Sequence, residues 1–240
     1  MEETKFTFKR YEKKYLLTAE QYAALWQRLE PWLEPDEYPS STVCSVYYDS
    51  DDYRLIRHSV EGPVYKEKLR LRSYNIPVDG DQVFIELKKK YKGIVYKRRV
   101  AMDAERAVQW LSGERPPEED SQMIREIDFF LRSYRPVPKA HIACDRTAWR
   151  AKEDAELRIT FDKDIRWRQT ELDLRAGSRG EPLLPDGQVL MEIKIPEAAP
   201  LWLAHMLSEL SLFPVSFSKY GVCYKEHILD DYIKEVVFNA

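Results

Sequence analysis

The chain has 240 residues, of which 44% are hydrophobic and 33% are charged, a composition that excludes a disordered or low-complexity protein. No stretch approaches the roughly 18 apolar residues of a membrane-spanning helix. The polar first residues give no sign of a secretory signal peptide. The spacing of Cys44, Cys144 and Cys223 fits neither a zinc site nor a disulfide scaffold, so we expect a protein of the reducing cytoplasm.

The net charge is only -3, but its distribution is uneven. Residues 65–99 contain eleven Lys/Arg and four Asp/Glu, a balance of +7. Residues 100–130 contain three and eight, a balance of -5. A basic segment in a near-neutral chain indicates a local anionic ligand, and it argues less for binding nucleic acid over a whole surface.

The hydrophobic pattern predicts mostly strands with a few helices. We expect a strand over 6–17, a helix over 19–33 capped by Thr18, a strand over 42–48 and a short helix over 53–58. The later expected strands are 64–74, 82–91, 94–102, 139–151, 157–165, 171–174 and 189–195. The later expected helices are 103–111, 121–134, 200–212 and 224–237.

About eight strands with a period of two in one chain favour a closed antiparallel β-barrel with helices packed on its outside, an α+β fold. No repeat or long linker divides the sequence, so we expect a single domain over residues 1–240.

The strands carry charges at alternate positions, which lie on one face of a strand. These faces are Arg10, Glu12 and Lys14; Lys68, Arg70 and Arg72; Glu86, Lys88 and Lys90; Lys97 and Arg99; Arg158, Thr160 and Asp162; and Glu192 and Lys194. Any one of them could simply face solvent. Three like charges along one strand repel each other unless an anion compensates, and the opposite faces are apolar. We therefore expect apolar faces under the helices and charged faces lining a hydrated tunnel that holds a polyanion.

Carboxylates share these faces. Glu12, Glu86, Asp162 and Glu192 offer the oxygen ligands that Mg²⁺ and Mn²⁺ prefer. The alternative role is salt bridging to neighbouring cations. The pattern leaves both roles open for Glu12 and Glu86 and favours metal binding for Glu192.

Eight short motifs then occur in an order that resembles the VTC domain, in its bacterial form. They are FKRYEKKY from Phe8, YYDS from Tyr47, KLRLR from Lys68, IELK from Ile85, DRTA from Asp145, LRITFD from Leu157, LMEIK from Leu190 and SFSKY from Ser216. The resemblance covers about residues 6–225. It places the chain beside the triphosphate tunnel metalloenzymes and CYTH proteins.

The resemblance implies a polyphosphate polymerase, which transfers the γ-phosphate of ATP to a growing polyphosphate chain and releases ADP with Mn²⁺ or Mg²⁺. The implied catalytic residues are Arg70, Arg72, Lys88 and Arg146. Residues expected to bind the triphosphate or the polymer are Arg10, Lys14, Lys68, Lys97, Arg99, Arg158, Lys194 and Lys219. Glu192 is the implied metal ligand, with Glu12 and Glu86 as further candidates. The expected partners are ATP and polyphosphate, with no nucleic acid, and the family allows a separately encoded membrane protein.

Two positions depart from the pattern of relatives. CYTH proteins begin with Glu-x-Glu-x-Lys, and here Arg10 takes the place of the first glutamate. Eukaryotic VTC domains have a lysine three places before the position of Lys219, and here that residue is Ser216. The first change shifts the strand towards anion binding, and the second weakens the expected grip on the polymer.

Three other functions are compatible with the same charged residues. Water could cleave inorganic or organic triphosphates in the same tunnel, with Glu12 or Glu86 orienting it. The domain could also bind polyphosphate or nucleotide without turnover, or bind RNA or DNA, although an enclosed tunnel would not admit a duplex. His58, His141, His205 and His227 lie outside the alternating faces, so we expect them to be structural or at the surface.

Overall fold

The computed structural model describes residues 11–92, 94–196 and 198–238, with Phe238 described by its backbone only. Its strands are β1 Tyr11–Leu17, β2 Leu33–Asp49, β3 Tyr65–Tyr74, β4 Gln82–Tyr91, β5 Ile94–Asp103, β6 Val137–Ala151, β7 Arg158–Arg168, β8 Glu181–Pro182 and β9 Val189–Ile195. Its α-helices are α1 Ala19–Leu29, α2 Arg54–Val60, α3 Ala104–Leu111, α4 Gln122–Tyr134, α5 Leu201–Glu209, α6 Lys219–Cys223 and α7 Leu229–Phe238. Short 3₁₀ helices span Glu30–Trp32 and Leu174–Ala176, and a π-helix spans Tyr224–Ile228.

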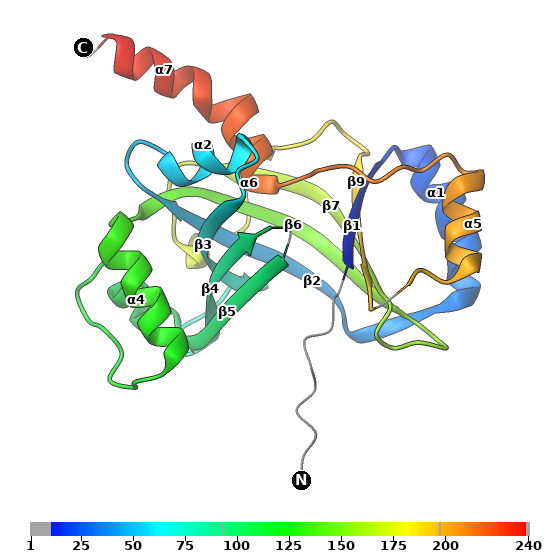
Figure 1. Cartoon of the computed structure of the whole chain (residues 1–240), viewed down its shortest axis with the longest axis horizontal. Helices are drawn as coiled ribbons and strands as arrows, with labels where there is room; N and C mark the ends of the chain where they lie inside the picture. Colours follow the sequence, from blue (N-terminus) through cyan, green and yellow to red (C-terminus); the bar gives the residue numbers. More distant parts are fainter. Residues whose placement is uncertain (1–10, 93, 197, 239–240) are drawn as a thin grey trace. The chain divides into compact units, whose positions relative to one another are not determined.

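The strands form one sheet in the order β1-β9-β7-β6-β2-β3-β4-β5, with β8 added to β7 (Figure 1). The β1–β9, β7–β9, β2–β3, β3–β4 and β4–β5 ladders are all antiparallel. The expected mixture of helices with a large antiparallel sheet is therefore confirmed. Within the described residues no ladder joins β1 to β5, so the expected closed barrel is not established.

Several helices begin where the sequence predicts, because residues that commonly cap helices precede them. The Thr18 side chain accepts a hydrogen bond from the backbone N–H of Gln21, and the Gln21 side-chain oxygen accepts one from the backbone N–H of Thr18. Asp103 caps α3 by accepting from two backbone N–H groups, and Ser121 caps α4.

Two expected boundaries near the first helix are wrong. The helix expected over 19–33 ends at Leu29, because Pro31 favours the short 3₁₀ turn that follows. The strand expected over 42–48 begins at Leu33 and passes through Pro35 and Pro39. Proline fixes φ at a value that extended backbone also adopts, so these prolines do not end the strand.

The strand expected over 171–174 is also wrong. The buried guanidinium of Arg168 donates to the backbone carbonyls of Thr170, Glu171 and Asp173, which folds this segment around itself. Glu171 has a φ of 50°, in the left-handed region that strands do not use. Only the short β8, which pairs with the end of β7, lies nearby in the sequence.

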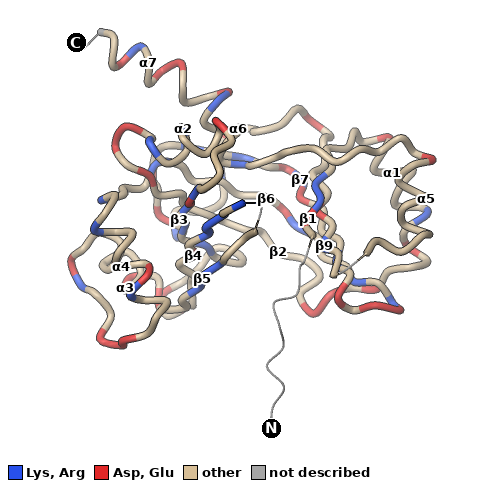
Figure 2. Tube along the Cα trace, viewed as in Figure 1, with Lys and Arg blue, Asp and Glu red and all other residues tan. Residues whose placement is uncertain are grey.

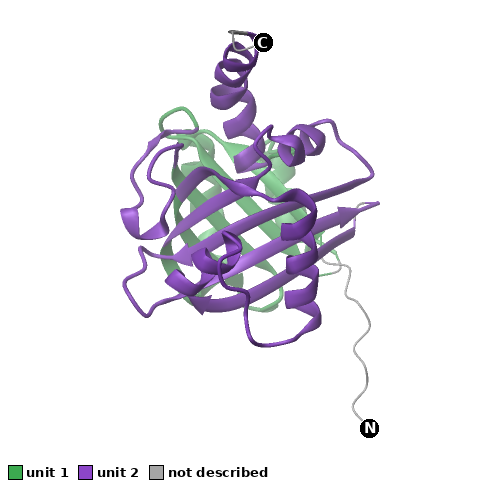
Figure 3. Ribbon diagram, turned by 90° about the vertical axis from the view of Figure 1, so that its left-hand side faces the viewer, with its two compact units in different colours: residues 1–41, 144–165, 184–217 green, residues 42–143, 166–183, 218–240 purple. Residues whose placement is uncertain are grey.

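The chain divides into two compact units, coloured separately in Figure 3. Unit 1 comprises residues 1–41, 144–165 and 184–217, and unit 2 comprises residues 42–143, 166–183 and 218–240. The long strands β2, β6 and β7 contribute residues to both units.

Each unit has its own hydrophobic core. In unit 1, α1 and α5 pack Leu25 and Leu203 against strand residues such as Ile159, Phe161 and Met191. The core of unit 2 brings residues of α3 and α4, including Trp110, Ile127 and Phe130, against the apolar faces of β3 and β4. The expected apolar strand faces under helices are thus present in each unit.

Among the described residues, no helix has both the length and the apolar composition needed to cross a membrane.

Candidate functional site

Strand β3 separates charged and apolar side chains between its two faces. Leu69 and Leu71 are buried in the core of unit 2, whereas Arg70 and Arg72 remain partly exposed on the other face. This separation follows from the period of two in a strand and from the helices that cover only one face. Figure 2 shows Lys and Arg gathered along β3, β4 and β5.

A single carboxylate gathers the cations of these three strands. Glu86 on β4 is buried, with 1% of its surface exposed, and it lies opposite Arg70 on β3 and Arg99 on β5. Its oxygens lie 2.6 Å from Arg70 Nη2 and 2.7 Å from Arg99 Nε. They also lie 2.5 Å from Lys97 Nζ and 3.8 Å from Arg72 Nε. We call these five residues the Glu86 cluster.

The Glu86 cluster is strongly electropositive, since four cations surround one carboxylate. Burial alone would raise the pKa of Glu86, but the charges of Arg70, Arg72 and Lys97 hold it far below the usual range. The carboxylate is therefore ionised near neutral pH. Burial and the neighbouring arginines lower the pKa of Lys97, despite the opposing effect of Glu86.

The repulsion expected along Lys68, Arg70 and Arg72 is thus offset in part by an anion that belongs to the chain. Sequence reasoning left Glu86 open between metal binding and salt bridging, and the structure favours salt bridging. A divalent cation at this carboxylate would lie among four positive side chains, so the donor set does not fit a metal.

Aromatic residues that the sequence did not single out complete the cluster. Arg70 donates to the Tyr47 hydroxyl over 3.2 Å, and Arg99 donates to the Tyr74 hydroxyl over 3.0 Å. The Arg99 guanidinium also lies 4.5 Å from the centre of the Phe84 ring. Tyr47 occurs in the YYDS motif, and the register that pairs it with Arg70 is the information the sequence lacked.

The Tyr47 phenol is buried and stacks on Tyr220, with ring centres 4.8 Å apart. Although burial would raise the pKa of this phenol, the charges of Arg70, Arg72 and Lys219 lower it. Lys219, a predicted binding residue at the start of α6, is therefore electrostatically coupled to the cluster.

Two further predicted residues extend this face. Lys68 and Lys88 lie directly opposite each other on β3 and β4, and Lys88 also lies opposite Lys97 on β5. The Lys68 ammonium donates to Ser218 Oγ over 2.8 Å, just before α6. The structure thus brings together, within unit 2, most of the predicted residues from the basic segment.

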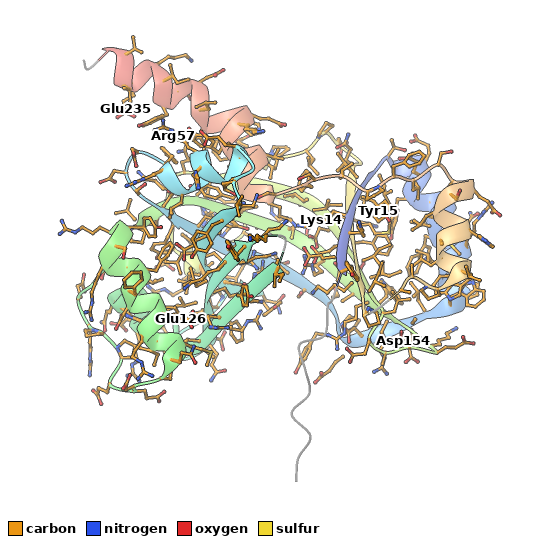
Figure 4. All side chains as sticks on the ribbon, in the orientation of Figure 1. Lys14, Tyr15, Arg57, Glu126, Asp154 and Glu235 are labelled. Carbon is orange, nitrogen blue, oxygen red and sulfur yellow. The ribbon has the colours of Figure 1, made fainter. Side chains whose placement is uncertain are left out.

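Unit 1 carries a second group of predicted residues, on β1 and β9. The Lys14 side chain, on β1, is labelled in Figure 4. Its ammonium lies 3.5 Å from a Glu12 oxygen and 3.8 Å from a Glu192 oxygen, and it donates to the carbonyl of Phe217. Lys194 Nζ lies 4.0 Å from the other Glu192 oxygen. Antiparallel pairing of Lys14 with Glu192 and of Glu12 with Lys194 produces this alternation of sign.

The two carboxylates of this group are the residues that fit a divalent metal. Glu12 and Glu192 both lie within 4 Å of one nitrogen, and the side chain of Glu192 is only 12% exposed. Thr160, opposite Glu192 in the register, has a buried hydroxyl for which no hydrogen-bond partner is found. Mg²⁺ is commonly held by one or two carboxylates together with substrate phosphates, so this donor set is compatible with it. No group of three or more His, Cys, Asp or Glu side chains suited to a metal occurs in the described part of the chain.

The remaining predicted residues of unit 1 are ion-paired. Arg146 on β6 donates twice to Asp162 on β7, over 2.6 and 2.8 Å, and Asp162 is fully buried. This pairing raises the pKa of Arg146 although burial alone would lower it. Arg158 lies 3.6 Å from Asp36. Arg10 lies outside the described residues.

One histidine has a defined structural role. His141 is fully buried, and the Arg168 guanidinium lies 3.0 Å from its Nδ1 atom. Burial and the charges of Arg168 and Arg166 lower the pKa of His141 to about 3, so the ring is neutral near pH 7. The neutral ring must then accept the Arg168 hydrogen bond at Nδ1 and carry its proton on Nε2.

The strand face with four cations around one buried carboxylate thus belongs to a fold that combines helices with a large antiparallel sheet. The chain belongs to the VTC domain family, whose model matches residues 9–227.

One curated protein and one solved structure are similar to this chain. Subunit 4 of the vacuolar transporter chaperone complex from Trypanosoma brucei brucei is 24% identical over 203 residues, which cover 71% of this chain. The match covers 26% of that subunit, so the chain spans about a quarter of the length of this curated relative. The crystal structure of a candidate adenylate cyclase from Bacillus halodurans superposes with a TM-score of 0.54 and 14% identity, covering 86% of this chain and 92% of that one. At this identity the likeness concerns the fold alone.

Proposed function

We propose that the protein is a polyphosphate polymerase, which transfers the γ-phosphoryl group of ATP to the end of a polyphosphate chain and releases ADP. The observation that carries this proposal is the Glu86 cluster in a chain of the VTC domain family. Four cations around one carboxylate leave an excess of positive charge, and arginine forks suit the oxygens of phosphoryl groups.

In the proposed reaction a terminal oxygen of the acceptor phosphate forms a new bond to the γ-phosphorus. The bond from the γ-phosphorus to the bridging oxygen breaks, and that oxygen leaves as part of ADP. The attacking oxygen is already anionic, so the reaction needs no general base. Positioning and charge neutralisation therefore supply most of the catalysis.

The residues of the Glu86 cluster have separate tasks in this proposal. Arg70 and Arg72 bind the transferred group and offset its charge, and Lys97 and Arg99 bind neighbouring phosphates. Glu86 keeps the four cations in place when no phosphate is bound. Lys88, Lys68 and Lys219 add positive charge at the edge of the cluster.

We further propose that Glu192, with Glu12 beside it, holds Mn²⁺ or Mg²⁺, which would neutralise phosphate oxygens during transfer. Lys14 then has two roles, since its ammonium offsets both carboxylates and contributes to phosphate binding. Lys194, Arg146 and Arg158 remain candidates for binding substrate. The cytoplasm is the expected location of the reaction.

The direct test incubates the purified protein with ATP and Mn²⁺ and resolves ADP, phosphate and polyphosphate from the same reaction. We expect ADP to be matched by a growing polymer ladder. The Arg70→Ala variant should lose this activity, whereas Arg132→Ala, at an exposed arginine on α4, should retain it. Phosphate without polymer would instead assign a triphosphatase. Triphosphate binding without turnover would assign a sensor.

A further inference from the structure

Strands β3 and β4 carry a row of lysines that continues beyond the Glu86 cluster. In the antiparallel register Arg70 lies opposite Glu86, Lys68 opposite Lys88, and Lys66 opposite Lys90. The cross-strand pairs therefore change from an arginine facing a carboxylate to lysine facing lysine. The last of these pairs lies one residue from the strand ends, at Tyr65 and Tyr91.

Opposed lysines on neighbouring strands repel each other. On this face, the positions beyond Glu86 are 66, 68, 88, 90, 95 and 97, and none of them is acidic. The adjacent carboxylate, Glu67, points to the other face, where it is buried and accepts from the Tyr134 hydroxyl. Glu126 on α4, which Figure 4 labels, pairs with Lys89 and Arg98, and these two residues lie on the opposite face of the strands from the row.

The fold nevertheless holds Lys66 in place. Its ammonium donates to the carbonyl of Ser59 in α2 over 3.1 Å, and its side chain is partly buried. Burial, followed by the charges of Lys90 and Lys88, lowers the pKa of Lys66. An anion bound between the strands would remove this repulsion.

We infer that Lys66 and Lys90 form an outer phosphate site, which binds the part of a polyphosphate chain that extends beyond the Glu86 cluster. This inference rests on the proposed function and deepens it. It gives the bound polyphosphate a direction along β3, and it makes Lys66 and Lys90 selective for long polymers. Lys68 and Lys88 lie between the outer site and the cluster and continue the path.

The length of the row supports a polymer as the ligand. From Arg72 to Lys66 the strand advances six residues, or about 20 Å at the usual rise of a strand. A ligand that contacts both ends of this row needs more phosphoryl groups than the three of a nucleoside triphosphate. A short ligand can therefore occupy the cluster without reaching the outer site.

The test measures binding of inorganic tripolyphosphate and of long-chain inorganic polyphosphate by calorimetry, at several salt concentrations and without ATP. The test variant is Lys66→Gln combined with Lys90→Gln. The matched control is Lys225→Gln combined with Lys234→Gln, which removes the same charge from exposed positions at the C-terminal end of the chain. Lys90→Gln alone is measured as well, because Lys66 also contacts α2.

We expect the test variant to bind long polyphosphate about five- to tenfold more weakly, as for the loss of two partly exposed charge contacts. The salt dependence of this affinity should decrease by about one unit for each lysine removed. The affinity for tripolyphosphate should change much less, and the control should match the wild type for both ligands.

Three outcomes would overturn the inference. Long polyphosphate could bind the test variant as tightly as the wild type. Both ligands could weaken equally, which would place the lysines in the central site. A single-stranded oligonucleotide could bind the wild type as tightly as polyphosphate does and lose the same affinity in the variant, which would assign the row to nucleic acid. Each outcome is read from binding alone, so it is distinct from a failure of the polymerase assay.

Discussion

Arg70 and Glu86 face each other across β3 and β4, with Arg70 Nε and Nη2 2.7 and 2.6 Å from one carboxylate oxygen of Glu86. The carboxylate is almost fully buried, and the guanidinium is partly exposed. This contact fixes the guanidinium while leaving part of it accessible to another anion. Glu86 thus acts as an internal counter-ion of the cluster and, in the proposed function, would hold its cations in place for a phosphate.

Replacing Glu86→Gln should destabilise the protein, because four cations would lose their shared carboxylate. Breaking a buried ion pair costs about 3–5 kcal/mol in free energy of unfolding. Thermal denaturation should show a lower Tm, and tripolyphosphate should raise the Tm of the variant more than that of the wild type. Glu118→Gln, at an exposed glutamate, serves as the control. A Tm equal to that of the wild type would show that Glu86 does not hold the cluster together.

The lowered pKa of Glu86 determines how its contribution to the free energy of unfolding changes with pH. The folded-state pKa lies well below the ordinary value of 4.5, so the stabilisation is complete above that value and is lost as the pH falls towards the folded-state pKa. Acid below pH 4.5 should therefore destabilise the wild type more steeply than the Glu86→Gln variant.

The Tyr47 hydroxyl is expected to position Arg70 and to offer its own hydrogen to a bound phosphate. Tyr47→Phe keeps the ring that stacks on Tyr220 and removes only the hydroxyl. We expect kcat for ADP release to fall about tenfold, as for the loss of one charge-assisted hydrogen bond, with little change in Tm.

The neighbouring Tyr48→Phe provides the matched control. Tyr48 belongs to the core of unit 2, and burial raises its pKa to about 12. Its hydroxyl is therefore not expected to contribute to catalysis. Equal values of kcat for the two variants would remove Tyr47 from the site.

Much of the charged face was predictable, because a period of two is visible without knowing which strands pair. Lys68, Arg70 and Arg72 share a face in the sequence and in the structure. The partner of each residue was not predictable, since it depends on register. This is why Glu86 could be read as a metal ligand, and why Tyr47 was missed although its motif was noted.

Other failures have local causes that only the folded chain reveals. The sequence around Glu171 resembles a strand, but the buried Arg168, the last residue of β7, donates to the backbone carbonyls of this segment and folds it into a loop. The strand expected over 42–48 was too short, because the backbone of β2 accommodates Pro35 and Pro39. In both cases tertiary contacts or backbone geometry override the local preference.

His141 should make the protein sensitive to mild acid. The folded-state pKa of His141, about 3, lies below the ordinary value of 6.5. Between these two pH values the histidine is protonated in the unfolded chain and neutral in the folded protein. The free energy of unfolding should therefore fall as the pH decreases from 6.5 towards 3. The slope from this residue is about 1.4 kcal/mol per pH unit.

Urea denaturation at pH 7 and pH 5 can isolate this effect. The loss between these values should be about 2 kcal/mol smaller in His141→Gln than in the wild type. His205→Gln, at an exposed position on α5, should behave like the wild type. An unchanged difference in His141→Gln would show that this histidine is not held neutral. Both measured pH values lie above 4.5, where the Glu86 contribution is complete, so the two contributions can be separated.

Glu192 is the residue on which the metal proposal depends most directly. Replacing Glu192→Gln should keep ATP binding but lower the affinity for Mn²⁺ at least tenfold, because an amide loses the charge that a divalent cation requires. Titration with Mn²⁺, followed by its paramagnetic resonance signal in the absence of ATP, gives this value without relying on turnover. Glu12→Gln should have a smaller effect, since the side chain of Glu12 is more exposed than that of Glu192. Glu209→Gln, at an exposed glutamate paired with Arg28, controls for the loss of one negative charge. Wild-type affinity for Mn²⁺ in Glu192→Gln would exclude this residue as the metal ligand and would leave it as an ion-pair partner of Lys14 and Lys194.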